Sequence, residues 1–338
     1  MLRPFSIPWN RPVTARLSRL PLCCTVFLAS CAGRQSALDP AGPAAASIHR
    51  LGIWMYVGAT LVTLLVTALA LVPFLRRRER PVNRKLFLWG GGVALPLLTL
   101  TVLVPYVIGV GHEVRAPTAP DRLSVDITGQ QYWWEMSYWR AGGVSAARSA
   151  NELRLPVGEP VELILRSTDV IHSFWIPNFA GKVDNIPGRA NRLVIQADRP
   201  GLYRGQCAEY CGRQHSLMAF DVIALPRAEF DAWLARLAQP VREPPDPQLQ
   251  EGKQLFLSLG CGACHTIRGV VEGRNGPDLT QVGARRMIGA GALPGGVGNI
   301  AGWIASSQHL KPGNAMPSFN RLEGLQLRAL AAYMESLK

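Results

Sequence analysis

Apolar positions are concentrated in the first third of the chain, where residues 51–75 and 86–110 form two long runs without a charged side chain. Each run is longer than the ~20 residues that a helix needs to cross a ~30 Å hydrocarbon layer. A helix satisfies its own backbone hydrogen bonds in lipid. The pattern therefore predicts a hairpin of two membrane helices over residues 48–111.

Beyond residue 121 the pattern changes to short apolar runs rich in β-branched and aromatic residues. These runs are separated by turns that contain Gly and Pro, which is typical of a β-sandwich. We expect this domain over residues 121–240, with strands at 123–128, 161–166, 192–196 and 219–225.

The last part of the chain has helical spacing instead. A proline-rich linker is predicted at residues 241–249. Apolar positions recur at helical intervals in residues 250–259 and 325–337, so residues 250–338 are predicted to form a small helical domain whose first and last helices pack together.

The N-terminus has the pattern of an export signal, with basic residues followed by a short apolar core at residues 20–30. The core ends in Leu28-Ala29-Ser30-Cys31, which resembles a bacterial lipoprotein box. That resemblance implies a leader over residues 1–31 and lipidation of Cys31. The alternative is an ordinary buried cysteine in an uncleaved leader.

The formal net charge is +13, and much of it lies in the first 85 residues, beside the apolar runs. Lys and Arg loops stay on the cytoplasmic side of a membrane. The connection between the two runs carries one acid, Glu79, against six cations, so everything after residue 111 is expected outside. The cations are Arg76, Arg77, Arg78, Arg80, Arg84 and Lys85. This distribution favours lipid headgroups as partners and argues against nucleic acid, for which no basic-aromatic platform is present.

One short segment concentrates soft metal ligands. Residues 207–218 contain two thiols, one imidazole and one thioether, and His172 is the only other histidine of the β-rich domain. Sulfur together with imidazole suits copper. The alternatives are a Cys207–Cys211 disulfide or a tetrahedral zinc site. Met218 argues against zinc, and the neighbouring His215 argues against a simple disulfide.

A second motif opens the helical domain. Cys261-Gly262-Ala263-Cys264-His265 has the C-x-x-C-H spacing of covalent haem attachment. Cys261 and Cys264 would form the thioethers, and His265 would bind the iron. A redox dithiol would not need that histidine. The sixth ligand must come from further along the chain, where Met287, Met316 and Met334 are the candidates.

The copper segment resembles the copper A loop of cytochrome c oxidase subunit II, and the similarity extends over roughly residues 48–226, including the signature at residues 181–189. The resemblance implies a Greek-key cupredoxin fold. It also implies two coppers bridged by Cys207 and Cys211. The terminal ligands would be His172, His215, a weakly bound Met218 and the carbonyl of Glu209, whose carboxylate would reach a magnesium shared with subunit I.

The helical domain resembles class I cytochromes c in two loops. Residues 314–319 are similar to their axial-methionine loop, which favours Met316 as the sixth ligand, and residues 276–279 are similar to the proline loop near the proximal histidine. Methionine with histidine raises the potential of a haem. The fused arrangement resembles the caa type of cytochrome c oxidase subunit II.

Two segments depart from the family pattern. The aromatic segment Tyr132, Trp133 and Trp134 is similar to the patch through which electrons arrive, but Tyr132 stands where many members have tryptophan. The alternative is ordinary packing of the two tryptophans. Residues 86–96 contain no acid, so a proton-channel glutamate found in many members is missing here.

The expected architecture is a membrane α-helical hairpin, an all-β cupredoxin-like Greek-key sandwich and an all-α class I cytochrome c domain. The resemblance implies a bacterial inner-membrane protein that takes electrons from an external cytochrome c or a membrane donor. It would pass them to oxidase subunit I beside subunit III, with proton translocation and no catalytic oxygen site on this chain. The alternatives are a structural quinol-oxidase subunit without metal and an electron-transfer component of a nitrogen-oxide reductase.

Overall fold

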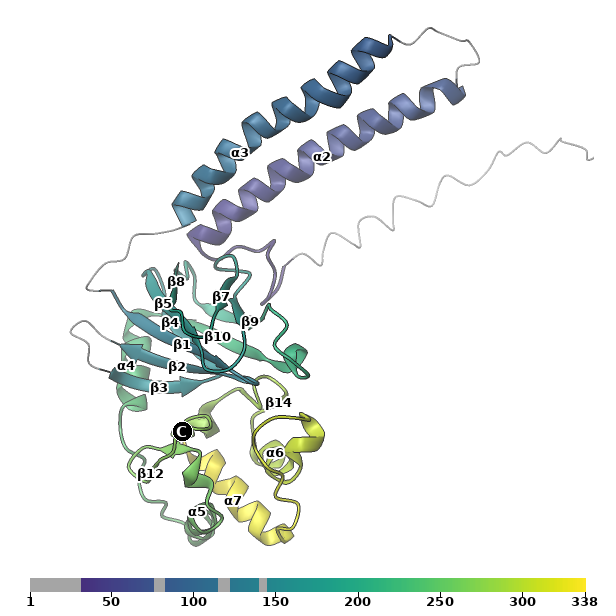
Figure 1. Cartoon of the computed structure of the whole chain (residues 1–338). Coiled ribbons are helices and arrows are strands. Elements are labelled where there is room, and N and C mark those ends of the chain that lie inside the picture. Colours follow the sequence, from purple (N-terminus) through teal and green to yellow (C-terminus); the bar gives the residue numbers. More distant parts are fainter. Residues whose placement is uncertain (1–31, 76–82, 115–121, 140–144) are drawn as a thin grey trace, which may run out of the picture.

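Three parts follow one another along the molecule: a helical hairpin, a pair of β-sheets and a small helical domain (Figure 1). The computed structural model describes residues 32–75, 83–114, 122–139 and 145–338. The expected lipidation site Cys31 and most of the basic connection, residues 76–82, lie outside the described residues.

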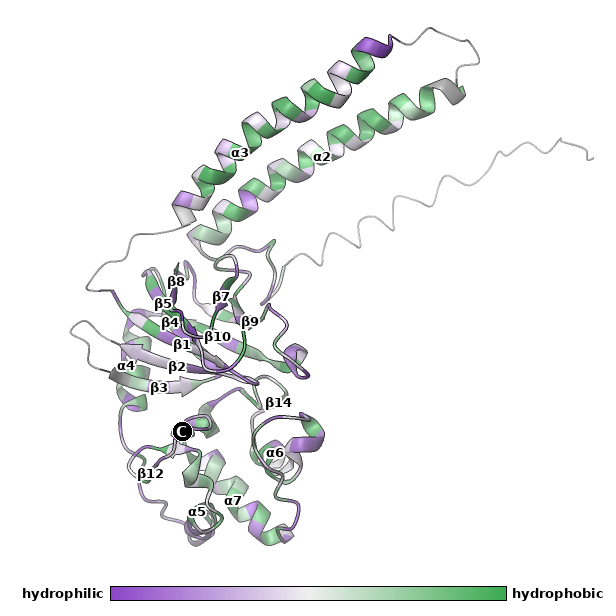
Figure 2. Ribbon diagram, viewed as in Figure 1, coloured by the Kyte–Doolittle hydropathy of each residue, from purple (hydrophilic) through white to green (hydrophobic). Residues whose placement is uncertain are grey.

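The hairpin consists of helix α2, Pro43–Leu75, and a second helix with two segments, π-helical η2 at Leu86–Ala94 and α3 at Leu95–Val114. Stretches of 30 and 27 residues in these helices are long and apolar enough to cross a membrane. Hydrophobic residues follow one another along most of both helices (Figure 2), and nearly all of their described side chains are exposed. The two apolar helices that the sequence predicts are present, but they extend from Pro43 to Val114 rather than over residues 48–111, and the π-helical segment was not predicted.

Helix α2 begins earlier than residue 51 and is joined to the sandwich at its base. Pro43 suits the first turn of a helix because its missing N–H has no partner there. The backbone N–H of Ala41 donates to Asn178 O (2.7 Å), and that of Ala45 donates to Phe179 O (3.0 Å). These bonds fix the start of the hairpin against the β-domain.

Two five-stranded sheets form the middle part, in the orders β3-β2-β1-β5-β8 and β4-β10-β9-β6-β7. Strand β1 pairs with β2 antiparallel and with β5 parallel, so neighbours in space are not always neighbours in sequence. Helix α4, Arg227–Leu237, covers one side. The strands are β1 Ser124–Gln130, β2 Trp133–Trp139, β3 Ser145–Ala150, β4 Glu152–Pro156, β5 Val161–Ser167, β6 His172–Trp175, β7 Val183–Asn185, β8 Asn191–Ile195, β9 Gly201–Cys207 and β10 Ala219–Leu225.

Alternation along the strands places one face of each sheet in a common core. In β2 every second residue is buried, beginning with Trp134. The Trp134 ring meets Phe174 and Phe220 edge-on at centroid distances of 5.4 and 5.6 Å. The predicted sandwich is thus confirmed, with its predicted strands displaced by at most two residues at their ends.

Substituting Gly205 with alanine is expected to destabilise the sandwich by about 1–3 kcal/mol because it overpacks the core. A Cβ at this position would lie 2.0 Å from the Phe220 ring. Gly181→Ala is the matched control, since its Cβ would meet Ile48 at an ordinary 3.6 Å. Denaturant unfolding of both variants measures the difference; equal stabilities would show that the Phe220 ring moves away without cost.

The helical domain is built around α5, Pro247–Ser258, and α7, Gly324–Ser336. Asp246 caps α5 by accepting from the N–H groups of Gln248 and Leu249. The Phe256 and Tyr333 rings meet edge-on at 6.3 Å, so the first and last helices pack together as predicted. The other elements are η4 Cys261–Ala263, β11 Thr266–Ile267, β12 Val271–Glu272, η5 Val282–Ala284, β13 Met287–Ile288, β14 Leu293–Pro294 and α6 Val297–Leu310.

Candidate metal centres

Three strand ends of one sheet meet at the sulfur-rich segment of residues 207–218, called the copper loop below. His172 is the first residue of β6, Cys207 is the last residue of β9, and Met218 directly precedes β10. Strand β9 pairs with both β6 and β10: Cys207 lies opposite Phe174, two residues after His172, and its N–H donates to Met218 O. The short 3-10 helix η3, His215–Leu217, returns the chain from Cys211 to β10.

The predicted copper ligands converge in space. The two Sγ atoms of Cys207 and Cys211 are 3.8 Å apart. An imidazole flanks each of them: His172 Nδ1 lies 3.9 Å from Cys207 Sγ, and His215 Nδ1 lies 3.7 Å from Cys211 Sγ. Met218 Sδ is 3.8 Å from Cys211 Sγ. The set offers two sulfurs at the centre and one nitrogen at each end.

Glu209 offers two different groups to its surroundings. Its backbone oxygen lies 3.2 Å from Cys207 Sγ, on the cluster side. Its carboxylate is partly exposed and lies 3.5 Å from Lys182 Nζ. A carbonyl directed at the sulfurs and a carboxylate directed away from them allow one residue to contact two separate cations.

The ionisation of the two thiols favours a cation between Cys207 and Cys211. The hydrogen bond with the Cys211 thiol lowers the pKa of Cys207 to about 3. The same contact raises the pKa of Cys211, because a second thiolate beside the first is unfavourable. Both cysteines are buried and free, and their separation far exceeds the ~2.05 Å of a disulfide. Positive metal charge would let both ionise.

Asp169 contacts the ligand histidine His172 on the side away from the sulfurs, and this residue was not predicted from the sequence. Its Oδ1 is 2.8 Å from His172 Nε2, and its Oδ2 accepts from the N–H of Gln131 at 2.6 Å. Burial opposes ionisation of His172, but its contacts with Cys207 and Asp169 together raise the pKa of this histidine. With Nε2 engaged, Nδ1 is left for the sulfur side, as in metal-bound histidines oriented by a carboxylate. A carboxylate three residues before a ligand histidine was the available signal.

Asp169→Asn is expected to weaken copper binding about 10- to 100-fold, the usual effect of removing a carboxylate that orients a ligand histidine. A competition titration against a copper chelator measures it. Asp231→Asn, on the distant helix α4, serves as the matched control and should leave the affinity unchanged. Equal affinities for both variants would mean that Asp169 does not orient His172.

The aromatic segment is mostly buried rather than exposed. Trp134 is fully buried, meets the His172 ring edge-on at 5.8 Å, and donates from Nε1 to Met218 O (3.4 Å). Tyr132 is 8% exposed, and its hydroxyl accepts from the N–H of Arg213. Trp133 is half-buried. The alternative of core packing therefore holds for Trp134, although a role in electron uptake does not require exposure and stays a prediction.

The C-x-x-C-H motif presents a histidine with one nitrogen already engaged. His265 Nδ1 lies 2.8 Å from Pro277 O, which leaves Nε2 for iron. Burial lowers the pKa of His265, so the ring is neutral, the form that binds metal. Gly276 lies against this ring, where a Cβ would approach its Cε1 to 2.7 Å. The residues of this motif fit covalent haem attachment.

Met316 differs from the other two methionine candidates in its surroundings. It is half-buried in an irregular loop, whereas Met287 lies in β13 and Met334 is buried in α7. The Met316 backbone is fixed from both sides, because Asn314 Oδ1 accepts from its N–H and Ser307 Oγ donates to its oxygen. Met316 and Cys261 pack against the same hydrophobic cluster.

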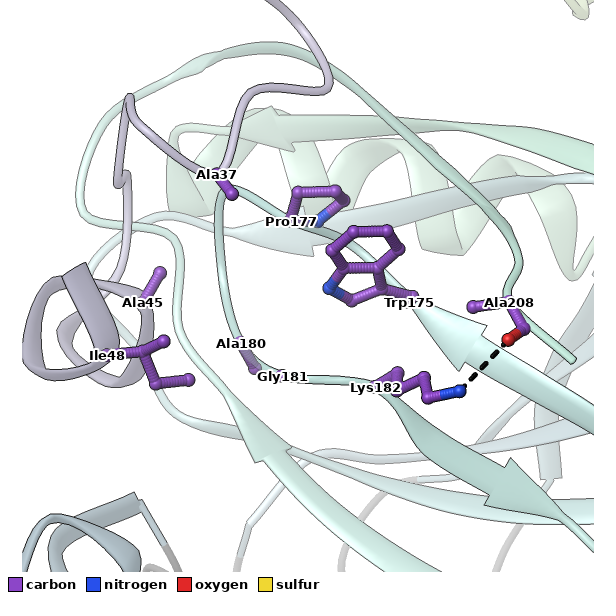
Figure 3. Close-up of a pocket in the computed structure, with 9 residues that line it drawn as sticks. All are labelled: Ala37, Ala45, Ile48, Trp175, Pro177, Ala180, Gly181, Lys182 and Ala208. Carbon is purple, nitrogen blue, oxygen red and sulfur yellow. Dashed lines mark hydrogen bonds between the residues drawn. The ribbon is translucent and has the colours of Figure 1, made fainter. Parts of the chain in front are cut away.

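A pocket of ≈ 430 Å³ lies between the start of α2 and the copper loop (Figure 3). Trp175 forms one wall, and Ala45 and Ile48 of α2 form another. At its rim Lys182 Nζ donates to Ala208 O at 3.1 Å, next to Cys207. The pocket therefore separates the base of the hairpin from the residue that follows Cys207.

Comparison with known proteins agrees with this arrangement. Residues 124–225 match the family described as "Cytochrome C oxidase subunit II, periplasmic domain", and residues 249–338 match the family "Cytochrome c". Cytochrome c oxidase subunit 2 of Alkalihalophilus pseudofirmus is 35% identical over 329 residues, which is 93% of this chain and 94% of that protein. Cytochrome c oxidase subunit 2 of Bacillus sp. (strain PS3) is 33% identical over 264 residues, 72% of each chain.

Among solved structures, the periplasmic domain of subunit II of the Bradyrhizobium japonicum cytochrome oxidase is 30% identical, covering 36% of this chain and 95% of that one, with a TM-score of 0.33. A sandwich that gathers sulfur and imidazole side chains, joined to two helices long and apolar enough to cross a membrane and followed by a domain with a haem-attachment motif, is the architecture of an electron-transport subunit. The chain belongs to the cytochrome c oxidase subunit II family and has a fused cytochrome c domain. Copper, haem and a place among other oxidase subunits follow from that membership.

Proposed function

We propose that this chain passes electrons from its own c-type haem to a copper A pair and then to oxidase subunit I, where oxygen is reduced. The observation that carries the proposal is the convergence of two thiols, two imidazoles and a thioether in one cluster, which is buried except for the half-buried His215. Quinol-oxidase relatives without metal would not need this set.

The residues at the copper site have separable roles. Cys207 and Cys211 would bridge two ions, with His172 and His215 as terminal ligands and Met218 and the Glu209 carbonyl as weaker ones. A pair of bridged coppers takes up one electron with little change of geometry when its ligands are held by a rigid sheet. Here His172 and Cys207 belong to paired strands, and Asp169 holds the first imidazole in place.

In the cytochrome c domain, Cys261 and Cys264 would hold the porphyrin and His265 and Met316 the iron. Methionine opposite histidine raises the potential, which matches a haem that equilibrates with copper A. Electrons would enter the copper site through Tyr132, Trp133 and Trp134. Two contacts support this: Trp134 meets the His172 ring, and Tyr132 O accepts from Lys311 of the cytochrome c domain.

Further parts of the proposal concern the surroundings of the chain. We propose a leader at residues 1–31 with lipidation of Cys31, a hairpin at 48–111, a copper domain at 121–240, a linker at 241–249 and a haem domain at 250–338. The soluble domains would lie outside a bacterial inner membrane. The partners would be subunits I and III and an external cytochrome c or membrane donor, and electron flow would be coupled to proton translocation. The exposed Glu209 carboxylate would reach a magnesium shared with subunit I.

Rapid-mixing spectroscopy of the purified oxidase complex tests the order of transfer. After reduction by a soluble donor, the c-haem band should reach its reduced form first and the copper band should follow, before oxygen is consumed. A copper band that is reduced without any dependence on the c-haem would contradict the proposed order.

A further inference from the structure

A buried lysine joins the haem domain to the copper loop. Lys311 follows helix α6 in the haem domain, yet only 2% of its surface is exposed. Its Nζ donates to Tyr132 O (2.8 Å) and Leu217 O (2.7 Å), both in the copper domain, and to Gly289 O (3.0 Å) in its own domain. All three donors of the ammonium group are thereby used.

The hydrogen bonds of Lys311 indicate that this side chain fixes the position of the haem domain. Among the described residues no carboxylate forms an ion pair with Lys311, so the hydrogen bonds of its buried Nζ all go to three backbone carbonyls. Burial lowers the pKa of Lys311 to about 7. Burial of the Lys311 ammonium is favourable only while all three carbonyls accept its hydrogen bonds, because an unpaired buried charge or carbonyl is costly. Removing the domain contact would therefore leave Lys311 with one of its three partners.

The contact also lies between the two metal-binding loops. On the copper side, Leu217 directly precedes the ligand Met218. On the haem side, Lys311 O accepts from Asn314 Nδ2 (2.7 Å), and Asn314 Oδ1 accepts from the N–H of Met316 (2.8 Å). A continuous chain of hydrogen bonds and covalent neighbours thus runs from one methionine to the other.

Adjacent contacts hold the same arrangement. Gln214 Nε2 donates to Pro312 O at 2.8 Å, and the N–H of Ala219 donates across the domains to Ala290 O at 3.2 Å. At the other haem loop, Arg148 Nη2 donates to the hydroxyl of Thr266, the residue after His265, at 2.8 Å. The loops that carry His265 and Met316 both touch the copper domain, next to its ligand loop on the Met316 side.

We propose that Lys311 is a positioning residue that keeps the haem domain docked on the copper loop, so that electrons cross a fixed interface. A flexible tether would raise the effective concentration of the haem, but each transfer would then wait for an encounter. Docking removes that wait. This inference rests on the proposed transfer from haem to copper A, and it adds a specific residue and a fixed geometry to it.

The experiment uses the complete oxidase complex with the copper A pair and the c-haem bound. A photoreductant delivers one electron to the c-haem. In the wild type, the rate of haem reoxidation by copper A should not change when glycerol raises the solvent viscosity. In Lys311→Met the rate should fall about tenfold or more, the effect expected when charge-assisted hydrogen bonds that favour one arrangement are lost. It should also become dependent on viscosity.

Two further variants separate docking from general damage. Lys311→Gln keeps N–H donors on a shorter side chain and should have an intermediate rate. Lys338→Met removes an exposed lysine that pairs with Glu335 at the end of the same domain and should behave as the wild type. A Lys311→Met rate equal to that of the wild type, or a wild-type rate that already depends on viscosity, would overturn the proposal.

Hydrogen exchange gives a second readout that does not depend on electron transfer. The Ala219 N–H is bonded across the domains, so peptides covering residues 213–220 should exchange faster in Lys311→Met while the copper and c-haem spectra persist. Unchanged exchange would refute docking through Lys311. A wild-type haem that never reduces the copper would instead count against the proposed function, and the exchange result would still decide the docking.

Discussion

Replacing Cys207 with serine is expected to abolish the copper-thiolate absorption and to stop electron transfer beyond the c-haem. Cys207 lies at the centre of the cluster, in contact with His172, Cys211 and the Glu209 carbonyl. A serine hydroxyl is a hard, protonated ligand that cannot bridge two soft ions. Copper content, the visible and near-infrared spectrum, and single-turnover kinetics of the purified complex measure the effect.

Cys261→Ser provides the reciprocal control for that variant. Cys261 belongs to the haem motif and lies in the other domain, so its substitution should alter haem attachment and leave the copper band intact. If Cys207→Ser retained both coppers and wild-type transfer to the oxygen-reducing site, the bridging role of this residue would be wrong. Loss of copper in both variants would indicate a general folding defect instead.

The second large effect is expected at the haem. Met316→Ala should lower the haem reduction potential by on the order of 100 mV or more, within the ~0.8 V range that axial ligands span. The rate of electron transfer from the haem to copper A should change together with the haem potential. The haem itself should remain attached through Cys261 and Cys264. Spectroelectrochemical titration of the c-band gives the potential.

Met287→Ala is the matched control, because Met287 lies in β13, paired with Pro294 in the same domain. Its potential should equal that of the wild type. An unchanged α-band and potential in Met316→Ala would exclude Met316 as the sixth ligand, and a shift confined to Met287→Ala would assign that role to Met287.

The features that the sequence predicted well are those encoded by neighbouring residues. The copper loop holds four ligand side chains within residues 207–218, so their chemistry could be deduced without knowledge of the fold. His172 was found because no other histidine of the domain was available. The hairpin was predicted because a run of uncharged residues longer than a bilayer has few alternatives.

The features that it missed depend on how the chain folds in space. Asp169 lies only three residues before His172, but the sequence does not show that its carboxylate also accepts from the distant N–H of Gln131 and is thereby held against the His172 ring. Lys311 looks like an exposed lysine at a helix end, and nothing nearby in sequence indicates that carbonyls of Tyr132 and Leu217 will enclose it. The sequence left packing of Trp134 as one of two alternatives, and only the pairing of β1 with β2 and the opposing sheet show that its ring is buried.

Electron paramagnetic resonance combined with copper analysis of the wild-type protein tests the central claim most directly. The account predicts two coppers per chain and, in the mixed-valence pair that can still accept one electron, hyperfine splitting from two equivalent copper nuclei that share one unpaired spin. A single copper per chain with the hyperfine pattern of one isolated nucleus would contradict a bridged pair at Cys207 and Cys211.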